Sequence, residues 1–196
     1  APMALANQLA LHVLQVSKLQ PMAKFIGINK TWHASQRRIG GRLALAVADQ
    51  VNSQLGQGLD LKGQVGTALF GDFNDPATAQ LRVRASAGNT SNVQPALNIT
   101  DSSVLTTSDY RLEFDGTQYS ARRLSDGATL TVNPNPPGSY PAALSFTDAS
   151  GRDQGFEIAL DAAPAANDRY LLQPTRRGAT DCATLAFPPA GSAATA

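Results

Sequence analysis

Between Leu69 and Pro174, apolar and polar residues alternate in short runs, and turn-forming residues interrupt the runs about every ten positions. A period of two places one face of each run in a core and the other in water, which is the pattern of a β-strand. Such spacing leaves no room for the crossover helices of a βαβ fold. The sequence therefore predicts a mainly antiparallel β domain over residues 66–174, either a small sandwich or a partly open barrel. The expected strands lie in 81–87, 92–100, 110–114, 117–123, 128–132, 144–147, 156–160 and 169–173, and Pro95 predicts an edge position or a bulge.

The clearest hairpin lies in the stretch DYRLEFDGTQYSARRLSDGATLTV. Asp115 and Gly116 suit the central positions of a type I′ turn, where both residues need a positive φ. A two-residue loop there would pair Phe114 with Thr117. This register predicts one core face with Tyr110, Leu112, Phe114 and Tyr119, and one wet face with Arg111, Glu113, Gln118 and Ser120.

The N-terminal part, residues 1–58, is expected to be helical, which makes the fold class α+β. An apolar stripe at residues 4–19 is interrupted by Pro21, and residues 22–38 hold no convincing period. Residues 42–55 form the more reliable helix, and Gly56 and Gly58 should end it. Its stripe consists of Leu43, Ala46, Val47, Val51 and Leu55. Residues 175–196 are rich in Ala, Pro and Gly, and they predict a disordered tail.

Charge and hydropathy exclude several functions. The 196 residues carry a formal net charge of +1, which gives no reason to expect nucleic acid as a partner. No apolar run reaches the length of a membrane span, so no membrane association is expected. The first acidic residue is Asp49, and an acid-free leader is compatible with a targeting segment, although no signal-peptide cleavage pattern is clear.

Candidate sites for metals and nucleophilic catalysis are weak. GLDLKG at 58–63 and GDFND at 71–75 lack the alternating carboxylates and the distal Glu of a calcium loop, so turns are the better interpretation. His12 and His33 are the only histidines, and without Cys or carboxylate neighbours they cannot build an ordinary zinc site or a triad. Cys182 is the only cysteine, so no intrachain disulfide can form, and an incidental thiol is expected.

The sequence also offers no pair of carboxylates suited to general acid–base catalysis. Glu113 and Glu157 are the only glutamates, and each is expected to be a solvated strand residue. The pair Arg122 and Arg123 is the best recognition feature, but a β-bulge there would explain it without a ligand. We therefore predict no catalytic, cofactor-binding or metal-binding residues, no cofactor, and no enzymatic activity.

Three phrases, in this order and spacing, resemble a known family. The first is GRLALAVADQVNSQLGQGLDLKGQVGTALF at 41–70, the second is the 108–132 hairpin stretch, and the third is GFEIAL followed by AANDRYLLQPTRRGA. Together, over about residues 40–179, they resemble the flagellar hook-associated protein 1 family, the first hook–filament junction protein. The matching positions are Asn52, Gln54, Gly58, Leu59, Asp60, Leu61, Gly63, Gly66, Leu69 and Phe70; then Asp109, Tyr110, Leu112, Phe114, Asp115, Gly116, Tyr119, Arg123, Leu124 and Gly127; then Gly155, Phe156, Asp168, Tyr170, Leu172 and Pro174.

The resemblance implies a structural, non-catalytic component of the bacterial flagellum that is secreted and acts in motility. It implies a ring of copies of the same chain, contacts with hook protein and the second junction protein, and delivery by the flagellar export apparatus and a chaperone. Residues 1–36 and 181–196 show no likeness to the family, and we hypothesise that they come from a shifted reading frame or were added by engineering. Two alternatives stay open: an extracellular β-sandwich for binding or adhesion, which would need an exposed aromatic platform, and a hydrolase, which would need an activated nucleophile or an acid pair.

Overall fold

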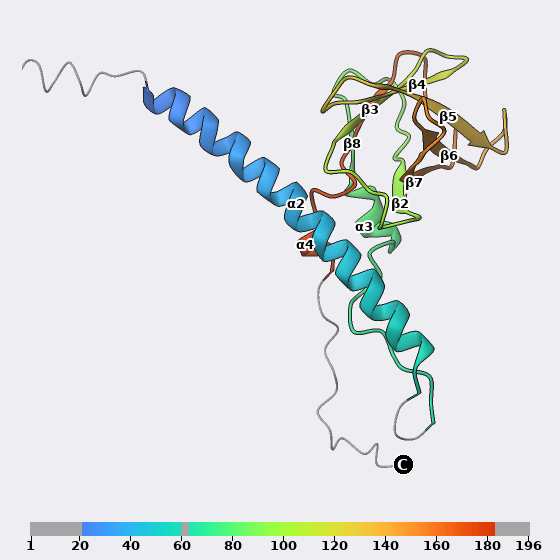
Figure 1. Ribbon diagram of the computed structural model, residues 1–196. Helices are drawn as coiled ribbons and strands as arrows, with labels where there is room; N and C mark the ends of the chain where they lie inside the picture. Colours follow the sequence, from blue (N-terminus) through green and yellow to red (C-terminus); the bar gives the residue numbers. More distant parts are fainter. Residues whose placement is uncertain (1–20, 60–62, 183–196) are drawn as a thin grey trace, which may run out of the picture. The chain divides into compact units, whose positions relative to one another are not determined.

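The structure is a computed structural model that describes residues 21–59 and 63–182, with side chains from residue 35 onward. The chain divides into two compact units, residues 1–36 and residues 37–196, and the second unit holds all the strands. The elements, labelled as in Figure 1, are α2 (Pro21–Gln57), α3 (Pro76–Gln80), β1 (Val83–Ala85), β2 (Ala96–Ile99), β3 (Tyr110–Phe114), β4 (Tyr119–Arg123), β5 (Thr129–Asn135), β6 (Ala142–Thr147), β7 (Asp153–Leu160), β8 (Arg169–Leu172) and α4 (Gly178–Asp181).

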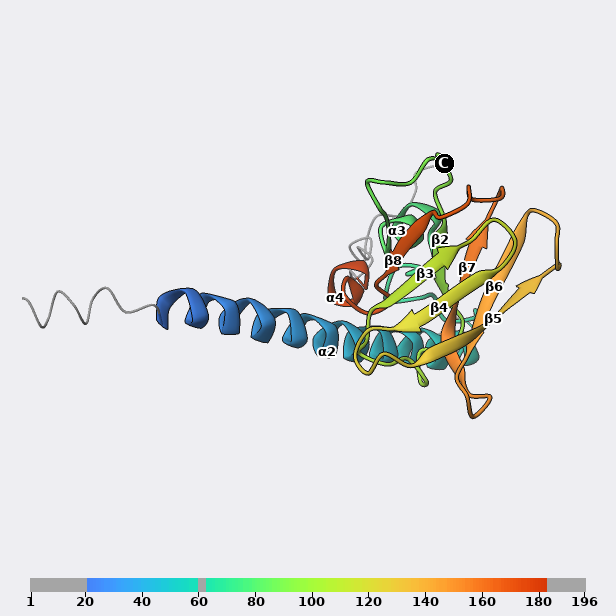
Figure 2. The ribbon, with the colours of Figure 1, turned by 90° about the horizontal axis from the view of Figure 1, so that it is seen from above.

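The strands form one antiparallel sheet in the order β1-β8-β3-β4-β5-β6-β7-β2. Strands β3 to β7 follow one another as a meander, and β8 returns to lie beside β3 (Figure 2). The two edges lie near each other, because Arg82 Nη1, just before β1, donates to the Leu97 carbonyl of β2 at 3.3 Å. The predicted α+β class is confirmed, and the β domain is a nearly closed, barrel-like sheet.

The apolar faces of the strands fill the interior of this sheet, as alternation predicts. Phe156 lies at its centre, with ring centroids 4.9 Å from Tyr110 and 5.1 Å from Phe146. Each fully buried side chain of this size contributes about 1.5–3 kcal/mol by leaving water. The largest apolar side chains with almost no exposure are Tyr110, Tyr170, Phe146, Phe156, Leu45, Leu97, Leu105, Leu112, Leu144, Ile158 and Leu160.

The hairpin of β3 and β4 has the predicted faces but a different turn. Phe114 pairs with Tyr119 rather than with Thr117, so the predicted register is wrong by two residues. A shift of two preserves which side chains share a face, because the side-chain period is two. Gly116 has φ +105°, whereas Asp115 has no positive φ, so the predicted type I′ turn is wrong. The Asp115 carboxylate instead accepts the N–H groups of Thr117 and Gln118, both at 2.7 Å, which moves the turn one residue along the chain.

Helix α2 is longer than the sequence predicts, because it begins at Pro21 and runs through residues 22–38 without interruption. Proline is compatible with the first turn of a helix, where its missing N–H has no partner to lose. A helix also needs no amphipathic period when its residues have sufficient propensity, and this stretch holds two Ala, two Lys and two Arg with one Met and one Gln. The predicted helix at residues 4–19 lies outside the described residues.

The chain after β8 differs from the expected disordered tail over residues 175–182. Thr175 is fully buried, Cys182 is 8% exposed, and α4 forms between them. The remainder of the expected tail, residues 183–196, lies outside the described residues.

The edge strand β2 is protected by a side chain. Asn74 Nδ2 donates to the Ile99 carbonyl at 2.8 Å, and Asn74 Oδ1 accepts the Ile99 N–H at 2.8 Å, so its amide pairs as a strand would. Pro95 directly precedes this strand, which agrees with the predicted edge position.

Candidate functional site

The second unit fastens α2 to the β domain through one face of the helix. Leu45 and Ala48 are fully buried, and Gly41 and Asn52 continue the same face at helical spacing. This buried face is not the stripe singled out from the sequence. The helix therefore has two apolar faces, and only one of them meets the β domain.

Asn52 holds the chain that returns along the helix. Its Oδ1 accepts the N–H groups of Leu69 at 2.9 Å and Phe70 at 3.0 Å, and its Nδ2 donates to the Phe70 carbonyl at 2.9 Å. These three residues belong to the first phrase of the family resemblance, and the bonds give that phrase a physical reason.

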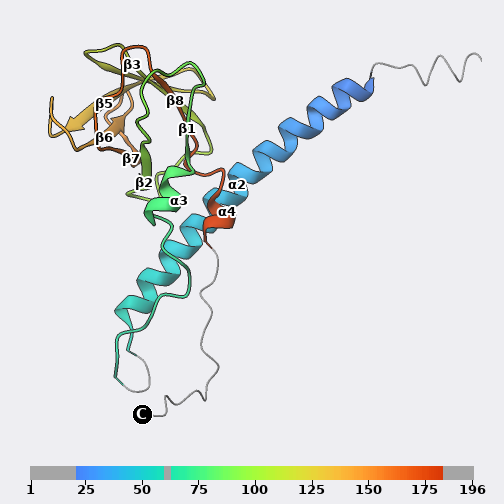
Figure 3. The same cartoon turned by 180° about the vertical axis from the view of Figure 1, so that it is seen from behind.

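Gly41 allows the segment before α4 to cross the helix at backbone contact. A Cβ on Gly41 would lie 1.7 Å from the Thr175 carbonyl oxygen, and one on Gly178 would lie 2.2 Å from the Gly41 carbonyl oxygen. Glycine is the only residue that fits at either position. The absence of a Cβ at Gly41 and at Gly178 therefore allows α2 and the 175–178 segment to cross at this distance, as Figure 3 shows.

Two buried carboxylates tie the same region together. Asp109 Oδ2 accepts from Arg38 at 3.2 Å and from Arg176 at 2.6 Å, which joins α2 to the start of β3 and to the chain after β8. Asp181 Oδ2 accepts from Arg82 at 3.0 Å, and Asp181 Oδ1 forms an ion pair with Arg177 at 3.3 Å. Burial lowers the pKa of Arg82, while the adjacent Asp181 acts in the opposite direction.

The predicted helix stripe exists, but much of it faces outward. Leu43 is 64% exposed, Val47 46% and Leu55 37%, and Ile39, one turn earlier, is 60% exposed. Ile39, Leu43 and Val47 follow a spacing of four along α2, and Leu55 lies two such steps beyond Val47 with the partly buried Val51 between them, so the four lie along one line on its surface. We call Ile39, Leu43, Val47 and Leu55 the outer stripe of α2. An exposed line of large apolar side chains indicates a contact surface.

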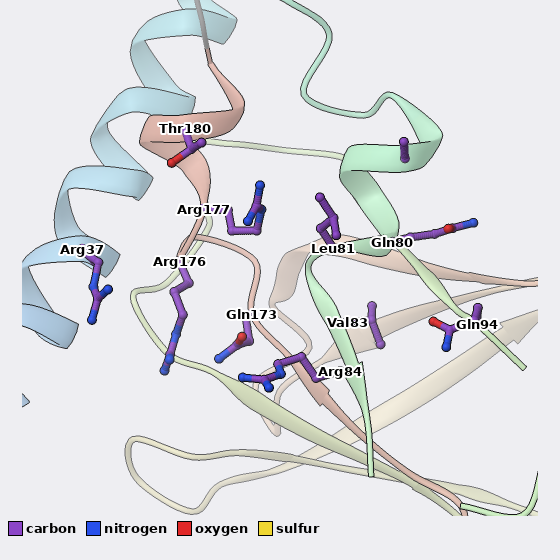
Figure 4. Close-up of a pocket in the computed structure, with 11 residues that line it drawn as sticks. Arg37, Gln80, Leu81, Val83, Arg84, Gln94, Gln173, Arg176, Arg177 and Thr180 are labelled. Carbon is purple, nitrogen blue, oxygen red and sulfur yellow. The ribbon is translucent and has the colours of Figure 1, made fainter. Parts of the chain in front are cut away.

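A cleft of about 770 Å³ opens between α2, α3, β1 and the segment after β8. Figure 4 shows Arg37 on α2 and Arg84 on β1 at opposite sides of this cleft, with Arg176 and Arg177 between them. The apolar part of its lining includes Leu81 and Val83. The cleft is therefore strongly cationic, which suits an anionic group and supplies no acid–base pair for catalysis.

The candidates weighed from the sequence fall in separate places. Cys182 is buried against the core, and burial raises the pKa of its thiol, which makes it a poor nucleophile. Glu113 lies between Arg111 and Arg169, at 3.8 and 3.5 Å, on the outer face as predicted. His12 and the side chain of His33 lie outside the described residues.

The loop GDFND is a turn, as predicted. The Asp72 carboxylate accepts the Asn74 N–H at 2.7 Å, and the Asp75 side chain caps α3. The other proposed turn, GLDLKG, falls partly outside the described residues. In the described part of the chain, no group of three or more His, Cys, Asp or Glu side chains could hold a metal ion.

Arg122 and Arg123 lie in a regular strand, so a bulge does not explain the pair. Arg122 faces outward and donates to the Gly127 carbonyl at 2.7 Å. Arg123 lies on the inner side at the end of β4, where it pairs with Asp126 at 2.9 Å and donates to Gln154 at 3.2 Å. An arginine can occupy an inward position there because its guanidinium reaches past the core to the end of the sheet.

The aromatic side chains of the hairpin do not form an exposed platform. Tyr110 is 1% exposed and Phe114 is 9% exposed, and the Tyr119 hydroxyl bonds to that of Tyr140 at 2.6 Å. Among the described helices, none is long and apolar enough to cross a membrane.

The sequence did not single out the residues that hold α2, the β domain and the segment after β8 together; we call this set of contacts the joint. Arg82 and Asp181 belong to no motif, Gly41 opens the first phrase of the resemblance without being one of its matching positions, and Asp109 entered only as a matching position. Their contacts join segments far apart in the chain, so no local period signals them. A glycine inside a predicted helix is the one available hint, since glycine lowers helix stability unless a close contact requires it.

Fold and site together define a structural interaction module, in which an antiparallel β domain is fastened to one face of a helix and the other face is left apolar. Residues 84–174 match the family model described as "Flagellar hook-associated protein 1, D2-like domain". The resemblance recognised in the sequence is confirmed.

Relatives and a solved structure agree. Flagellar hook-associated protein 1 of Escherichia coli (strain K12) is 32% identical over 136 residues, which is 68% of this chain and 21% of that protein. Its counterpart from Salmonella typhimurium is 27% identical over 147 residues, covering 72% of this chain and 23% of the relative. The flagellar hook junction protein FlgK from Burkholderia pseudomallei superposes with a TM-score of 0.61 at 29% identity, covering 78% of this chain and 25% of that one. The chain thus spans about a fifth to a quarter of the length of these proteins.

Proposed function

We propose that this chain is part of a structural, non-catalytic component of the bacterial flagellum at the hook–filament junction. The names of the similar proteins support this role. The observation that carries it is the outer stripe of α2, a line of four exposed apolar side chains on a helix whose other face is already fastened.

The outer stripe cannot turn inward to find cover. Gly41 is locked against Thr175, Leu45 and Ala48 are buried, and Asn52 is hydrogen-bonded to the returning chain, so rotating the helix would break all of these contacts. Covering a Leu, Ile or Val side chain contributes roughly 1.5–3 kcal/mol. A second helix packed along the line would supply that cover at the usual spacing of side-chain ridges.

By the resemblance, that cover comes from terminal helices of the same protein, packed in a ring of copies. The partners we propose are these copies, hook protein and the second junction protein, and the location is extracellular, at the flagellum. Delivery by the flagellar export apparatus with a chaperone requires the chain to travel unfolded. A chain whose one cysteine cannot form an internal disulfide is suited to refolding outside the cell.

Co-sedimentation with purified hooks tests this proposal. The 196-residue chain should sediment with hooks, and Leu43→Gln together with Val47→Gln should abolish most of that binding. Glutamine has nearly the helix propensity of leucine, so the helix itself should persist. Val65→Gln is the matched control, since Val65 is 64% exposed and lies off the helix.

Equal loss of binding in the control variant, or full binding by the helix variant, would contradict the assignment of the stripe as the assembly contact. The chain alone is expected to be a monomer or a weak dimer, because it spans only about a fifth to a quarter of the length of its relatives. A stable closed ring formed by the 196 residues alone, seen by light scattering, would contradict that expectation.

A further inference from the structure

Arginine side chains cross the outer face of four neighbouring strands in a single row. Arg84 of β1 pairs with Leu171 of β8, Leu171 pairs with Arg111 of β3, and Arg111 pairs with Arg122 of β4. Because directly paired residues lie on the same face of a sheet, these side chains form one line across the strands. Arg84, Arg111 and Arg122 are exposed.

The row is continuous with the cationic cleft. Arg84 lines both the cleft and an adjoining hollow of about 510 Å³ that also contains Arg111 and Arg169. Arg111 in turn lines a third hollow, of about 240 Å³, with Arg122. We call this connected surface the arginine track; its members are Arg37, Arg84, Arg111, Arg122, Arg169, Arg176 and Arg177.

The track carries far more positive than negative charge. Among the described residues that line the three hollows, Glu113 is the only carboxylate, and Arg111 and Arg169 already flank it. The nearby carboxylates of Asp109 and Asp181 are 6% and 2% exposed, and each is shared by two arginines. In the described structure, the guanidinium of Arg84 has no side-chain partner. Seven of the 16 Lys and Arg residues of this chain of net charge +1 thus lie on one surface.

We propose that the arginine track is a docking surface for a segment of a partner protein that carries several Asp or Glu side chains. This goes beyond the proposed function, which rests on the outer stripe of α2 and leaves the β domain without a partner. Charge complementarity defines the partner. Planar guanidinium groups bind carboxylates with two parallel hydrogen bonds, so a row of guanidinium groups is complementary to a segment with several carboxylates.

A protein fits the track better than a polyanion does. Every cation of the track is an arginine, and the chain has no lysine after Lys62. Arginine is enriched at protein–protein interfaces, where lysine is depleted. Leu81, 56% exposed in the cleft, and Leu124, 42% exposed beside Arg111, add apolar contact points that a phosphate or sulfate chain would not use.

The test measures binding of three labelled probes to the full chain by fluorescence anisotropy: a peptide of Glu with interspersed Leu, the same peptide with Gln in place of Glu, and heparin. The Glu peptide should bind, and binding should weaken as salt approaches about 0.15 M, where charges are screened over about 8 Å. Arg84→Glu combined with Arg111→Glu should weaken it at least tenfold. Both residues are exposed strand positions, and unchanged thermal unfolding will verify that the variant is folded.

Arg152→Glu combined with Arg42→Glu is the matched control, because it makes the same change in net charge away from the three hollows. It should weaken binding less than threefold. The proposal is overturned if the track and control variants lose binding equally, if the Gln peptide binds as well as the Glu peptide, or if neither peptide binds. Tighter binding of heparin than of the Glu peptide would also overturn it, in favour of an anionic polysaccharide.

Discussion

Arg82 Nη2 lies 3.0 Å from the Asp181 carboxylate, and both side chains are buried, at 0% and 2% exposure. The same guanidinium donates to Leu97 in β2, so one residue connects the opening between the two sheet edges with α4. Arg82 and Asp181 are 99 positions apart in the sequence. This pair therefore holds the C-terminal segment to the one place where the barrel is open.

Asp181→Ala should destabilise the second unit by about 3–5 kcal/mol, because it leaves the buried guanidinium of Arg82 without its counter-ion. The measurement is the midpoint of urea unfolding. Arg177→Gln is the control: Arg177 contacts the same carboxylate, but it is 39% exposed, so its loss should cost less than about 1 kcal/mol. An unchanged midpoint for Asp181→Ala would mean that the ion pair of Arg82 and Asp181 does not stabilise the opening between the two sheet edges.

Gly41→Ala should weaken the joint, because the new Cβ would lie 1.7 Å from the Thr175 carbonyl oxygen. Overpacking of this kind costs about 1–3 kcal/mol. The adjacent Gly40→Ala provides a matched control, since a Cβ there meets nothing within 4 Å and should stabilise the helix by about 0.5–1 kcal/mol. The melting temperatures of the two variants should therefore shift in opposite directions. A shift of the same sign in both would contradict the close backbone contact between Gly41 and Thr175.

Gly116→Val should cost about 1–3 kcal/mol, because Gly116 has φ +105° and a β-branched residue resists this conformation. A Cβ there would also lie 3.1 Å from the Ala166 Cβ. Thr117→Val is the comparison, since Thr117 is exposed in the same turn and has no positive φ. If both variants unfold at the same denaturant concentration, the turn tolerates a side chain at Gly116.

Phe114→Ala should cost about 3 kcal/mol, the lower end of the range for aromatic residues, because the ring is 9% exposed at the end of the core. Its ring centroid lies 4.6 Å from that of Tyr119, and this contact is lost as well. Leu124→Ala, at an exposed position, should change stability by less than about 0.5 kcal/mol. An unaltered melting temperature for Phe114→Ala would place the ring outside the core.

Asp168 should make stability depend on pH in the acid range. Its carboxylate accepts the Ser91 hydroxyl and the N–H groups of Thr90 and Ala165, and these bonds, led by the one from Ser91, lower the pKa of Asp168. A lowered folded-state pKa means that the stabilisation is complete above the unfolded value of about 3.9 and is lost as the pH falls through the folded value.

Asp168→Asn removes this titration, so the stability difference between wild type and variant should be greatest at neutral pH and should shrink below about pH 4. Urea unfolding at neutral and acid pH will measure it. A difference that stays constant, or grows, toward acid pH would show that the carboxylate charge is not what holds the loop.

Much of the β domain could be predicted because its information is local. Alternation in the strands from Tyr110 to Leu160 separates core from solvent at every second residue, and this parity survives even when a turn is misplaced, as the Phe114–Tyr119 pairing shows. The predicted type I′ turn is wrong because the Asp115 carboxylate binds two backbone N–H groups, and this competes with the backbone geometry that an Asp-Gly pair usually adopts.

The helix was harder to judge. An apolar stripe shows that a helix has a face to bury but not what covers it, so the sequence could not tell that Leu45 and Ala48 meet the β domain while Leu43 and Val47 stay exposed. The predicted disorder of the tail is wrong over residues 175–182 because composition describes propensity alone. Thr175 and Cys182 become ordered through burial that other segments provide.

The sequence by itself determined the α+β class, the strand positions and the polar and apolar faces, because periodicity and turn chemistry act within a few residues; the family resemblance rests on three phrases of the sequence. Only the tertiary structure decided which face of α2 is free, how Arg82 and Asp181 meet across the barrel opening, and that Arg84, Arg111 and Arg122 form one line. These depend on strand order and on close backbone approach at Gly41, both of which bring distant segments together. Distance along the chain carries no signal of such contacts, since many strand orders satisfy the same alternation.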